Sequence, residues 1–306
     1  MVCRNGEESK NTNWGRLTRL ITRPPFRDEF GHKGWMGRFS WAQPHAIRHI
    51  RLELAEWPRW SRPLRVAFLS DFHTGSHTKD VERLHLIVDE LARYLPDLAV
   101  FGGDYVNLQL WGGGRVPPRT IAAVLGRLVA PLGRFAILGN HDYCYDRYAV
   151  TQALEDHGTV VLEHNRRRVM FENFSLHIAG ISDAKVARPQ AQSLLKSLPP
   201  EPTIVLAHDP VWFGSLPPGP YIMLAGHTHG GQVRIPGLGV IKNSSKAPLR
   251  WTYGLIKERN QLLYVTSGVG TSVVPIRWRV PPEVVVMDLN GTGRVIADEG
   301  ASRARR

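Results

Sequence analysis

Cysteine is scarce in this chain, because Cys3 and Cys144 are the only two among 306 residues. So few thiols exclude a framework of several disulfides and a metal cluster held by thiolates. Long apolar runs are missing too, and no stretch approaches the ~18 consecutive apolar residues of a membrane-spanning helix. The basic N-terminus also lacks the apolar segment of a secretory signal. We therefore expect a globular protein of the cytoplasm.

Acidic residues are outnumbered, with 27 Asp and Glu against 39 Lys and Arg, which gives a formal net charge of +12. Positive charge attracts phosphate groups, whether they belong to nucleic acid, a nucleotide or an anionic membrane. The sequence shows no recognisable nucleic-acid-binding module. Its aromatic residues also do not alternate with basic ones in the main domain as base-stacking platforms would. We therefore expect no nucleic-acid partner, while the oligomeric state stays open.

The first 45 residues differ in composition from the rest. Residues 1–60 hold five of the nine tryptophans, and the first 45 also contain several arginines. Tryptophan beside arginine is typical of a segment at the headgroup level of a membrane. The alternative is a disordered leader, with Met36 as a second possible start. We predict a basic leader over 1–45, a main domain over 46–298 and a basic tail over 299–306.

Regular patterning begins after the leader. Residues 47–54 alternate apolar and polar side chains, which predicts a strand with one buried face. Further strands are expected at 64–70, 97–101, 135–138, 160–162, 169–171, 176–179, 203–207, 221–225, 262–266 and 283–289. Helices are expected at 79–94, 118–129, 147–157 and 190–198. This order predicts an α/β fold of two mixed sheets packed face to face, with helices outside.

Several apolar strands lead directly into residues that bind metals. Because ligands gather at the carboxyl ends of strands in layered α/β folds, we expect these side chains to line one crevice. Seven oxygen or imidazole ligands without a thiolate are too many for one ion and suit two ions that share a carboxylate. The seven candidates are Asp71, His73, Asp104, Asn140, His208, His227 and His229.

This ligand chemistry favours Mn²⁺, with Fe or Zn²⁺ as alternatives, over Ca²⁺. Two divalent metal ions about 3.5–4 Å apart hold a phosphate and activate water near neutral pH. The sequence therefore predicts hydrolysis of a phosphoester or phosphoanhydride.

The motifs resemble those of the calcineurin-like metallophosphoesterases over roughly residues 50–290. They are Asp71-x-His73, Gly103-Asp104, Gly139-Asn140-His141-Asp142, His208 and Gly226-His227-Thr228-His229. The strings GHTHGGQV (226–233) and SGVGTSVVPIRWRVPPE (267–283) are similar to the YkuE/YaeI-like branch. That branch includes bacterial enzymes that cleave the pyrophosphate of UDP-2,3-diacylglucosamine in lipid A synthesis. The resemblance implies a four-layer α/β/β/α sandwich.

The resemblance also implies a role for each candidate. A first ligand set would hold one metal and consists of Asp71, His73 and His229. A second ligand set would hold the other metal and consists of Asn140, His208 and His227. Asp104 would bridge the two ions. His141 would be the catalytic residue that protonates the leaving oxygen and contacts the phosphate.

Two positions depart from patterns in the family. Asn107 stands where many relatives have an aspartate that orients the catalytic histidine, and an amide stabilises imidazolium less than a carboxylate does. Tyr105 directly follows Asp104, whereas purple acid phosphatases place their ligand tyrosine three residues on. We therefore expect no tyrosine-ligated iron.

Three functions remain as hypotheses. The first is a phosphodiesterase or pyrophosphatase whose substrate is a phosphate-containing small molecule or a lipid-linked nucleotide such as UDP-2,3-diacylglucosamine. The positive charge then predicts peripheral contact with an anionic membrane, at the inner face of the cytoplasmic membrane. The second is a nuclease or cyclic-nucleotide phosphodiesterase. The third is a scaffold that keeps the fold without catalysis.

Overall fold

A computed structural model describes residues 43–77, 79–108, 114–183, 188–272 and 275–293 of the chain. Almost all of the expected leader and the whole of the expected tail lie outside these residues, so the division into these three segments stays a prediction. Within the described residues, no helix is both long and apolar enough to cross a membrane.

The first of two mixed sheets has six strands. They are β1 (Ala46–Leu54), β2 (Leu64–Leu69), β3 (Leu98–Phe101), β4 (Arg134–Ala136), β5 (Val160–Val161) and β12 (Glu283–Gly291). Their order is β1-β12-β2-β3-β4-β5. β12 pairs antiparallel with β2, and the other pairs are parallel.

The second sheet also has six strands. They are β6 (Asn165–Phe171), β7 (Phe174–Ile181), β8 (Thr203–Ala207), β9 (Tyr221–Ala225), β10 (Gly254–Glu258) and β11 (Gln261–Val265). Their order is β10-β11-β9-β8-β7-β6, with antiparallel pairs at its two edges and parallel pairs between.

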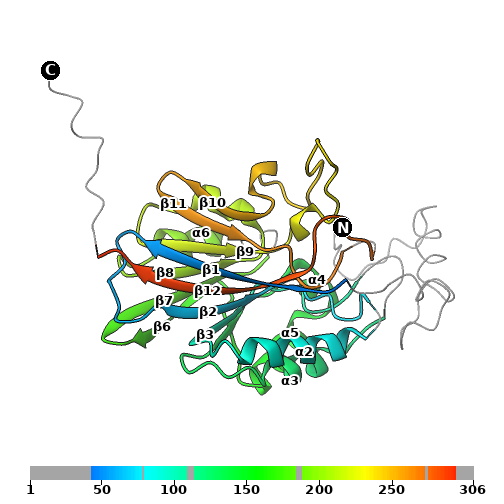
Figure 1. Ribbon diagram of the computed structural model, residues 1–306. Coiled ribbons are helices and arrows are strands. Elements are labelled where there is room, and N and C mark those ends of the chain that lie inside the picture. The colour runs from blue at the N-terminus through cyan, green and yellow to red at the C-terminus, as the bar shows by residue number, and fades with distance from the viewer. Residues whose placement is uncertain (1–42, 78, 109–113, 184–187, 273–274, 294–306) are drawn as a thin grey trace.

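Helices cover the outer face of each sheet (Figure 1). The first sheet packs against α2 (Asp80–Ala92), α3 (Pro118–Leu125) and α5 (Arg147–Asp156). The second sheet packs against α6 (Arg188–Lys196) and the 3₁₀ segment η2 (Pro210–Ser215). Three shorter segments are α4 (Asn140–Tyr145), η3 (His229–Gly231) and η4 (Leu249–Trp251). The four layers confirm the predicted α/β/β/α sandwich.

The strand β2 shows why its sequence is apolar at every position but Arg65. Val66 and Phe68 belong to the core between the two sheets, whereas Ala67 and Leu69 belong to the core beneath the helices. A strand that is covered on both faces has few positions for a polar side chain, and Arg65 stands next to the start of β2. The first polar residues after such a strand therefore lie at the edge of the sheet, where the loops begin.

Candidate metal centre

The first ligand set converges in the structure. Asp71 and His73 follow the carboxyl end of β2, and His229 begins η3 after β9. The Nε2 atom of His229 lies 3.5 Å from Oδ1 of Asp71 and 3.1 Å from Nε2 of His73. All three side chains are buried. Three metal-binding atoms thus face one small space.

The second ligand set converges beside it. Nε2 of His208 lies 3.3 Å from Oδ1 of Asn140 and 3.2 Å from Nδ1 of His227. His208 follows β8, Asn140 begins α4, and His227 lies between β9 and η3. The residues of the second ligand set therefore come from segments that follow strands of both sheets.

Asp104 lies between the two ligand sets. Its Oδ1 atom accepts a hydrogen bond of 2.8 Å from the backbone N–H of His141. Its Oδ2 atom lies 3.5 Å from Nε2 of His73 and 3.3 Å from Nε2 of His208. One oxygen is therefore fixed to the backbone, while the other faces one histidine from each set.

Carbonyl oxygens orient the imidazoles of the second ligand set. The Nδ1–H of His208 donates to the carbonyl of Gly102 at 2.7 Å, and the Nε2–H of His227 donates to the carbonyl of Ser244 at 3.2 Å. Each ring thus turns its other nitrogen toward the cluster. Burial lowers the pKa of His208, but the Asp104 carboxylate outweighs burial and raises this pKa well above 6.5. Metal-binding histidines are commonly oriented by such bonds.

The first ligand set also fits a cation. Burial lowers the pKa of His73 and of His229 well below 6.5, and for both the neighbouring histidines lower it further. Neutral imidazole is the form that binds metal. Among the described residues, the buried Nδ1 atoms of both rings have no hydrogen-bond partner, and their Nε2 atoms face each other. A cation between the rings would bind the lone pairs of the two Nε2 atoms that face each other.

The backbone at these residues is unusual. Asp71, His73, Asp104, His227 and His229 have φ angles of 52°, 39°, 56°, 67° and 51°. Non-glycine residues seldom adopt this left-handed region, and such strain clusters at functional sites. Hydrogen bonds between neighbouring loops hold the conformation, for example from Asp71 N to Gly103 O at 2.9 Å and from His73 N to Asp104 O at 2.9 Å.

Two glycines allow the carboxylates to approach the backbone. A Cβ atom on Gly139 would overlap the Asp104 carboxylate, and one on Gly226 would overlap that of Asp71. These positions therefore require glycine because the carboxylates occupy the space of a side chain.

His141 lies against the first ligand set. Its ring packs edge-on against that of His73, with centroids 4.4 Å apart and an interplanar angle of 84°. Burial lowers the pKa of His141, although Asp104 raises it. Asn107, whose position suggests contact with this histidine, donates from Nδ2 to the carbonyl of Gly114 at 3.0 Å.

Asp142 is a functional residue that the sequence reasoning missed. Its Oδ2 atom accepts from the backbone N–H of Gly139 and of Asp104, both at 2.8 Å, and Oδ1 accepts from Tyr105 N at 2.9 Å. Burial raises the pKa of this carboxyl to about 7. Asp142 thus joins the loop that carries Asp104 to the start of α4. Its place in the Gly-Asn-His-Asp motif was the available signal.

We expect the substitution Asp142→Asn to weaken metal binding, because an amide offers one acceptor oxygen to a site where two are used. Loss of a hydrogen bond that positions a metal ligand typically lowers metal affinity by about 10–100-fold. Titration of the metal-free protein with Mn²⁺ measures the effect. The exposed Asp156→Asn is the control, and an Mn²⁺ affinity equal to that of the wild type in Asp142→Asn would contradict the assigned role.

Arg277 is a second residue that the sequence reasoning missed. Its buried guanidinium donates from Nη2 to the carbonyls of Ser267 at 2.6 Å, Gly268 at 3.1 Å and Gly270, and burial lowers its pKa to about 10. The same loop donates from Gly270 N to the carbonyl of Asp71 at 2.7 Å. Arg277 therefore fixes a loop that lies directly behind the first ligand set.

The model of one family matches this part of the chain. The calcineurin-like phosphoesterase model covers residues 64–231, which include all seven candidate ligands and His141. The chain belongs to the calcineurin-like phosphoesterases. This phosphoesterase is therefore a metal-dependent phosphoester hydrolase, as the motifs predict.

The expected resemblance to the YkuE/YaeI-like branch is also confirmed. This phosphoesterase is 26% identical to the uncharacterized metallophosphoesterase YkuE of Bacillus subtilis, over 85% of its own length and 91% of the relative. It is 29% identical to phosphodiesterase YaeI of Escherichia coli, over 83% and 92% of the two chains. Among solved structures, the NAD nucleotidase of Haemophilus influenzae matches with a TM-score of 0.45 and 14% identity, over 67% of this chain and 45% of that one.

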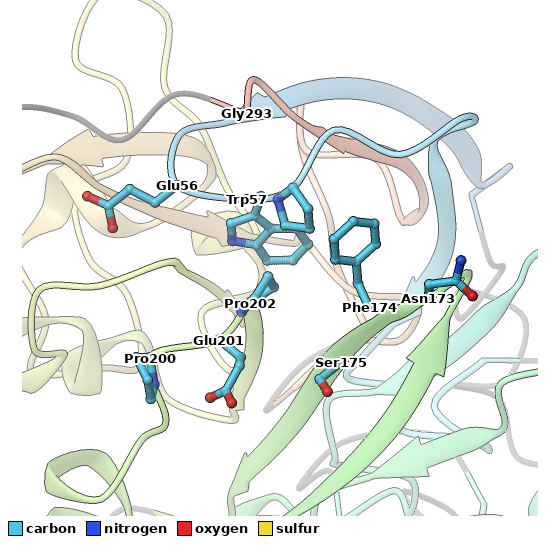
Figure 2. Close-up of a pocket in the computed structure, with 10 residues that line it drawn as sticks. Glu56, Trp57, Asn173, Phe174, Ser175, Pro200, Glu201, Pro202 and Gly293 are labelled. Atoms are coloured by element: carbon cyan, nitrogen blue, oxygen red, sulfur yellow. The ribbon is translucent and has the colours of Figure 1, made fainter.

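The structure also contains a pocket of about 430 Å³, and Figure 2 shows the residues that line it. Trp57, Phe174, Glu201 and Pro202 are among the residues that line it. Pro202 directly precedes β8, whereas His208 directly follows it. The pocket and the candidate ligands therefore lie at opposite ends of one strand, and the pocket is not part of the metal centre.

Proposed function

We propose that this phosphoesterase binds two divalent cations and hydrolyses a phosphodiester or pyrophosphate bond. The first ligand set would hold one cation, the second ligand set the other, and Asp104 both. The observation that carries the proposal is the position of Asp104 Oδ2, which faces His73 at 3.5 Å and His208 at 3.3 Å. When bound, two such cations neutralise phosphate charge and lower the pKa of water.

The chain's own residues supply the rest of the chemistry. His141 is placed by its backbone N–H on Asp104, so that its ring lies against the first ligand set. From there it would contact the phosphate and donate a proton to the leaving oxygen. Departure of an alkoxide without a proton is slow, and a positioned acid removes that barrier.

The relatives and the charge guide the choice of substrate. YaeI is a phosphodiesterase by name, which favours a diester or a pyrophosphate over a monoester. The net charge of +12 favours an anionic substrate. We propose a lipid-linked nucleotide, with UDP-2,3-diacylglucosamine as the specific candidate and Mn²⁺ as the metal.

Turnover on two substrates tests this proposal. The full chain, loaded with Mn²⁺, is assayed on bis(p-nitrophenyl) phosphate and on UDP-2,3-diacylglucosamine in detergent. We expect cleavage of both, with the lipid nucleotide cleaved faster. Cleavage of the artificial diester alone would refute the lipid substrate, and cleavage of neither by metal-loaded protein would refute the reaction.

A nuclease or a cyclic-nucleotide phosphodiesterase is the second candidate, which the positive charge also favours. Single-stranded DNA and cyclic AMP added to the same assay distinguish it. Faster cleavage of either than of the lipid nucleotide would replace the first candidate with the second.

A further inference from the structure

Two segments beside the metal centre form one surface, which we call the docking surface. Its residues are Val233, Arg234, Leu238, Ile241, Ile276, Trp278 and Arg279. The backbone links the segments, because Arg234 N donates to Trp278 O at 3.0 Å and Trp278 N donates to Gln232 O at 2.8 Å. Val233 lies four residues after His229, a member of the first ligand set. The segment between β9 and η4 projects beyond the two sheets (Figure 1).

The apolar side chains of this surface are exposed to water. Leu238 is 74% exposed, Ile241 62%, Ile276 57% and Trp278 51%. By contrast, Trp57, Trp60, Trp212 and Trp251 are buried. Large apolar side chains that gather on one exposed face mark a binding surface.

The charge of the docking surface has one sign. No acidic residue occurs between Asp209 and Glu258, or between Glu258 and Glu283. Arg234 and Arg279 are exposed, and neither forms an ion pair with any described carboxylate. The two arginines line a hollow of about 620 Å³ with Ile235, Pro236 and two glycines. This hollow offers two guanidinium groups to one anion.

We propose that the docking surface binds the headgroup region of an anionic phospholipid bilayer. A lipid phosphate would lie between Arg234 and Arg279, and Leu238, Ile241, Ile276 and Trp278 would enter the interface. Tryptophan, arginine and exposed aliphatic side chains together are typical of peripheral membrane contact. The inference deepens the proposed function, on which it rests, since it would bring the metal centre to a lipid-linked substrate.

Other occupants fit less well. A second copy of the chain would place one cationic surface against another, which costs free energy through like-charge repulsion. Single-stranded nucleic acid binds through stacked aromatic rings, whereas four of the five apolar residues here are aliphatic. Exposed aliphatic side chains beside one tryptophan and two arginines therefore favour a lipid surface.

Sedimentation with vesicles tests the inference. The full chain is mixed with vesicles of phosphatidylcholine alone, or of phosphatidylcholine with phosphatidylglycerol. We expect binding to the anionic vesicles and little to the neutral ones. We expect two double variants to weaken vesicle binding by about 10-fold or more. Leu238→Ser/Trp278→Ser removes apolar side chains that would enter the interface. Arg234→Gln/Arg279→Gln removes two cations, each of which contributes roughly 1 kcal/mol near an anionic membrane.

Matched controls separate this surface from general effects. Phe174→Ser changes an exposed aromatic residue at the pocket of Figure 2, and Arg167→Gln/Lys257→Gln removes two exposed charges elsewhere. Both should bind like the wild type. Every variant keeps residues 1–42, so any contribution of that segment is constant, and thermal unfolding checks that each variant is folded.

Three results would overturn the inference. The first is that the control variants lose as much vesicle binding as the docking-surface variants. The second is that the docking-surface variants bind anionic vesicles as tightly as the wild type. The third is that the wild type binds single-stranded DNA more tightly than anionic vesicles. The same preparations are assayed on bis(p-nitrophenyl) phosphate. Normal turnover without vesicle binding refutes the docking surface alone, whereas vesicle binding without turnover refutes the proposed function alone.

Discussion

Replacement of Asp104 by asparagine is expected to abolish turnover and metal loading together. The carboxylate uses Oδ1 to accept from His141 N and turns Oδ2 toward both ligand sets. An amide lacks the negative charge that two cations would share, and its NH₂ group donates where the site needs an acceptor. After reconstitution with Mn²⁺, elemental analysis measures the metal content and a diester assay measures turnover.

Asp97→Asn is the control for this variant. Asp97 is also a buried carboxylate, but it precedes β3 and pairs with Arg62 at 2.7 Å, whereas Asp104 follows the same strand. We expect Asp97→Asn to lower thermal stability and to leave metal content unchanged. If Asp104→Asn bound as much metal as the wild type, the bridging role would be wrong.

Replacement of His141 by alanine is expected to lower turnover while the metals stay bound. The side chain of His141 is assigned to proton transfer, and the hydrogen bond from His141 to Asp104 comes from its backbone N–H. Positioned acids typically contribute about 10²–10⁴-fold to the rate. The loss should be large for a diester with an alkoxide leaving group and small for p-nitrophenolate, which departs without a proton.

The comparison of leaving groups makes this prediction specific. A merely structural role of His141 would lower turnover of both diesters equally. His177→Ala, a change on β7 outside the centre, should alter neither. If His141→Ala lost its metals instead, His141 would be a ligand and the assigned role would be wrong.

The sequence predicts the strands and the layers of this fold well, because a run of apolar residues and the polar residues that end it are local features. A strand such as β2 is apolar at every position except Arg65 because it is covered on both faces, and its end is marked by Asp71 and His73. The convergence of residues from β2, β3, β8 and β9 follows from the rule that strand ends share an edge.

Features that depend on tertiary contact escaped prediction. The helix α4 has six residues without apolar periodicity and begins at a candidate ligand, Asn140. The positive φ angles at Asp71 and His73 are imposed by neighbouring loops rather than by residue type. Asp142 binds backbone N–H groups of Asp104 and Tyr105, and Arg277 binds carbonyls of the loop that precedes it. The Gly-Asn-His-Asp motif marks Asp142 but does not report which groups it binds, and no motif marks Arg277.

The most direct test of the central claim is a crystal of the full chain grown with Mn²⁺ and measured at a wavelength where manganese scatters anomalously. The account predicts two anomalous peaks with the Asp104 carboxylate between them. One peak should contact the first ligand set and the other the second ligand set. A single peak, or peaks away from Asp104, would contradict a centre in which two cations share this carboxylate.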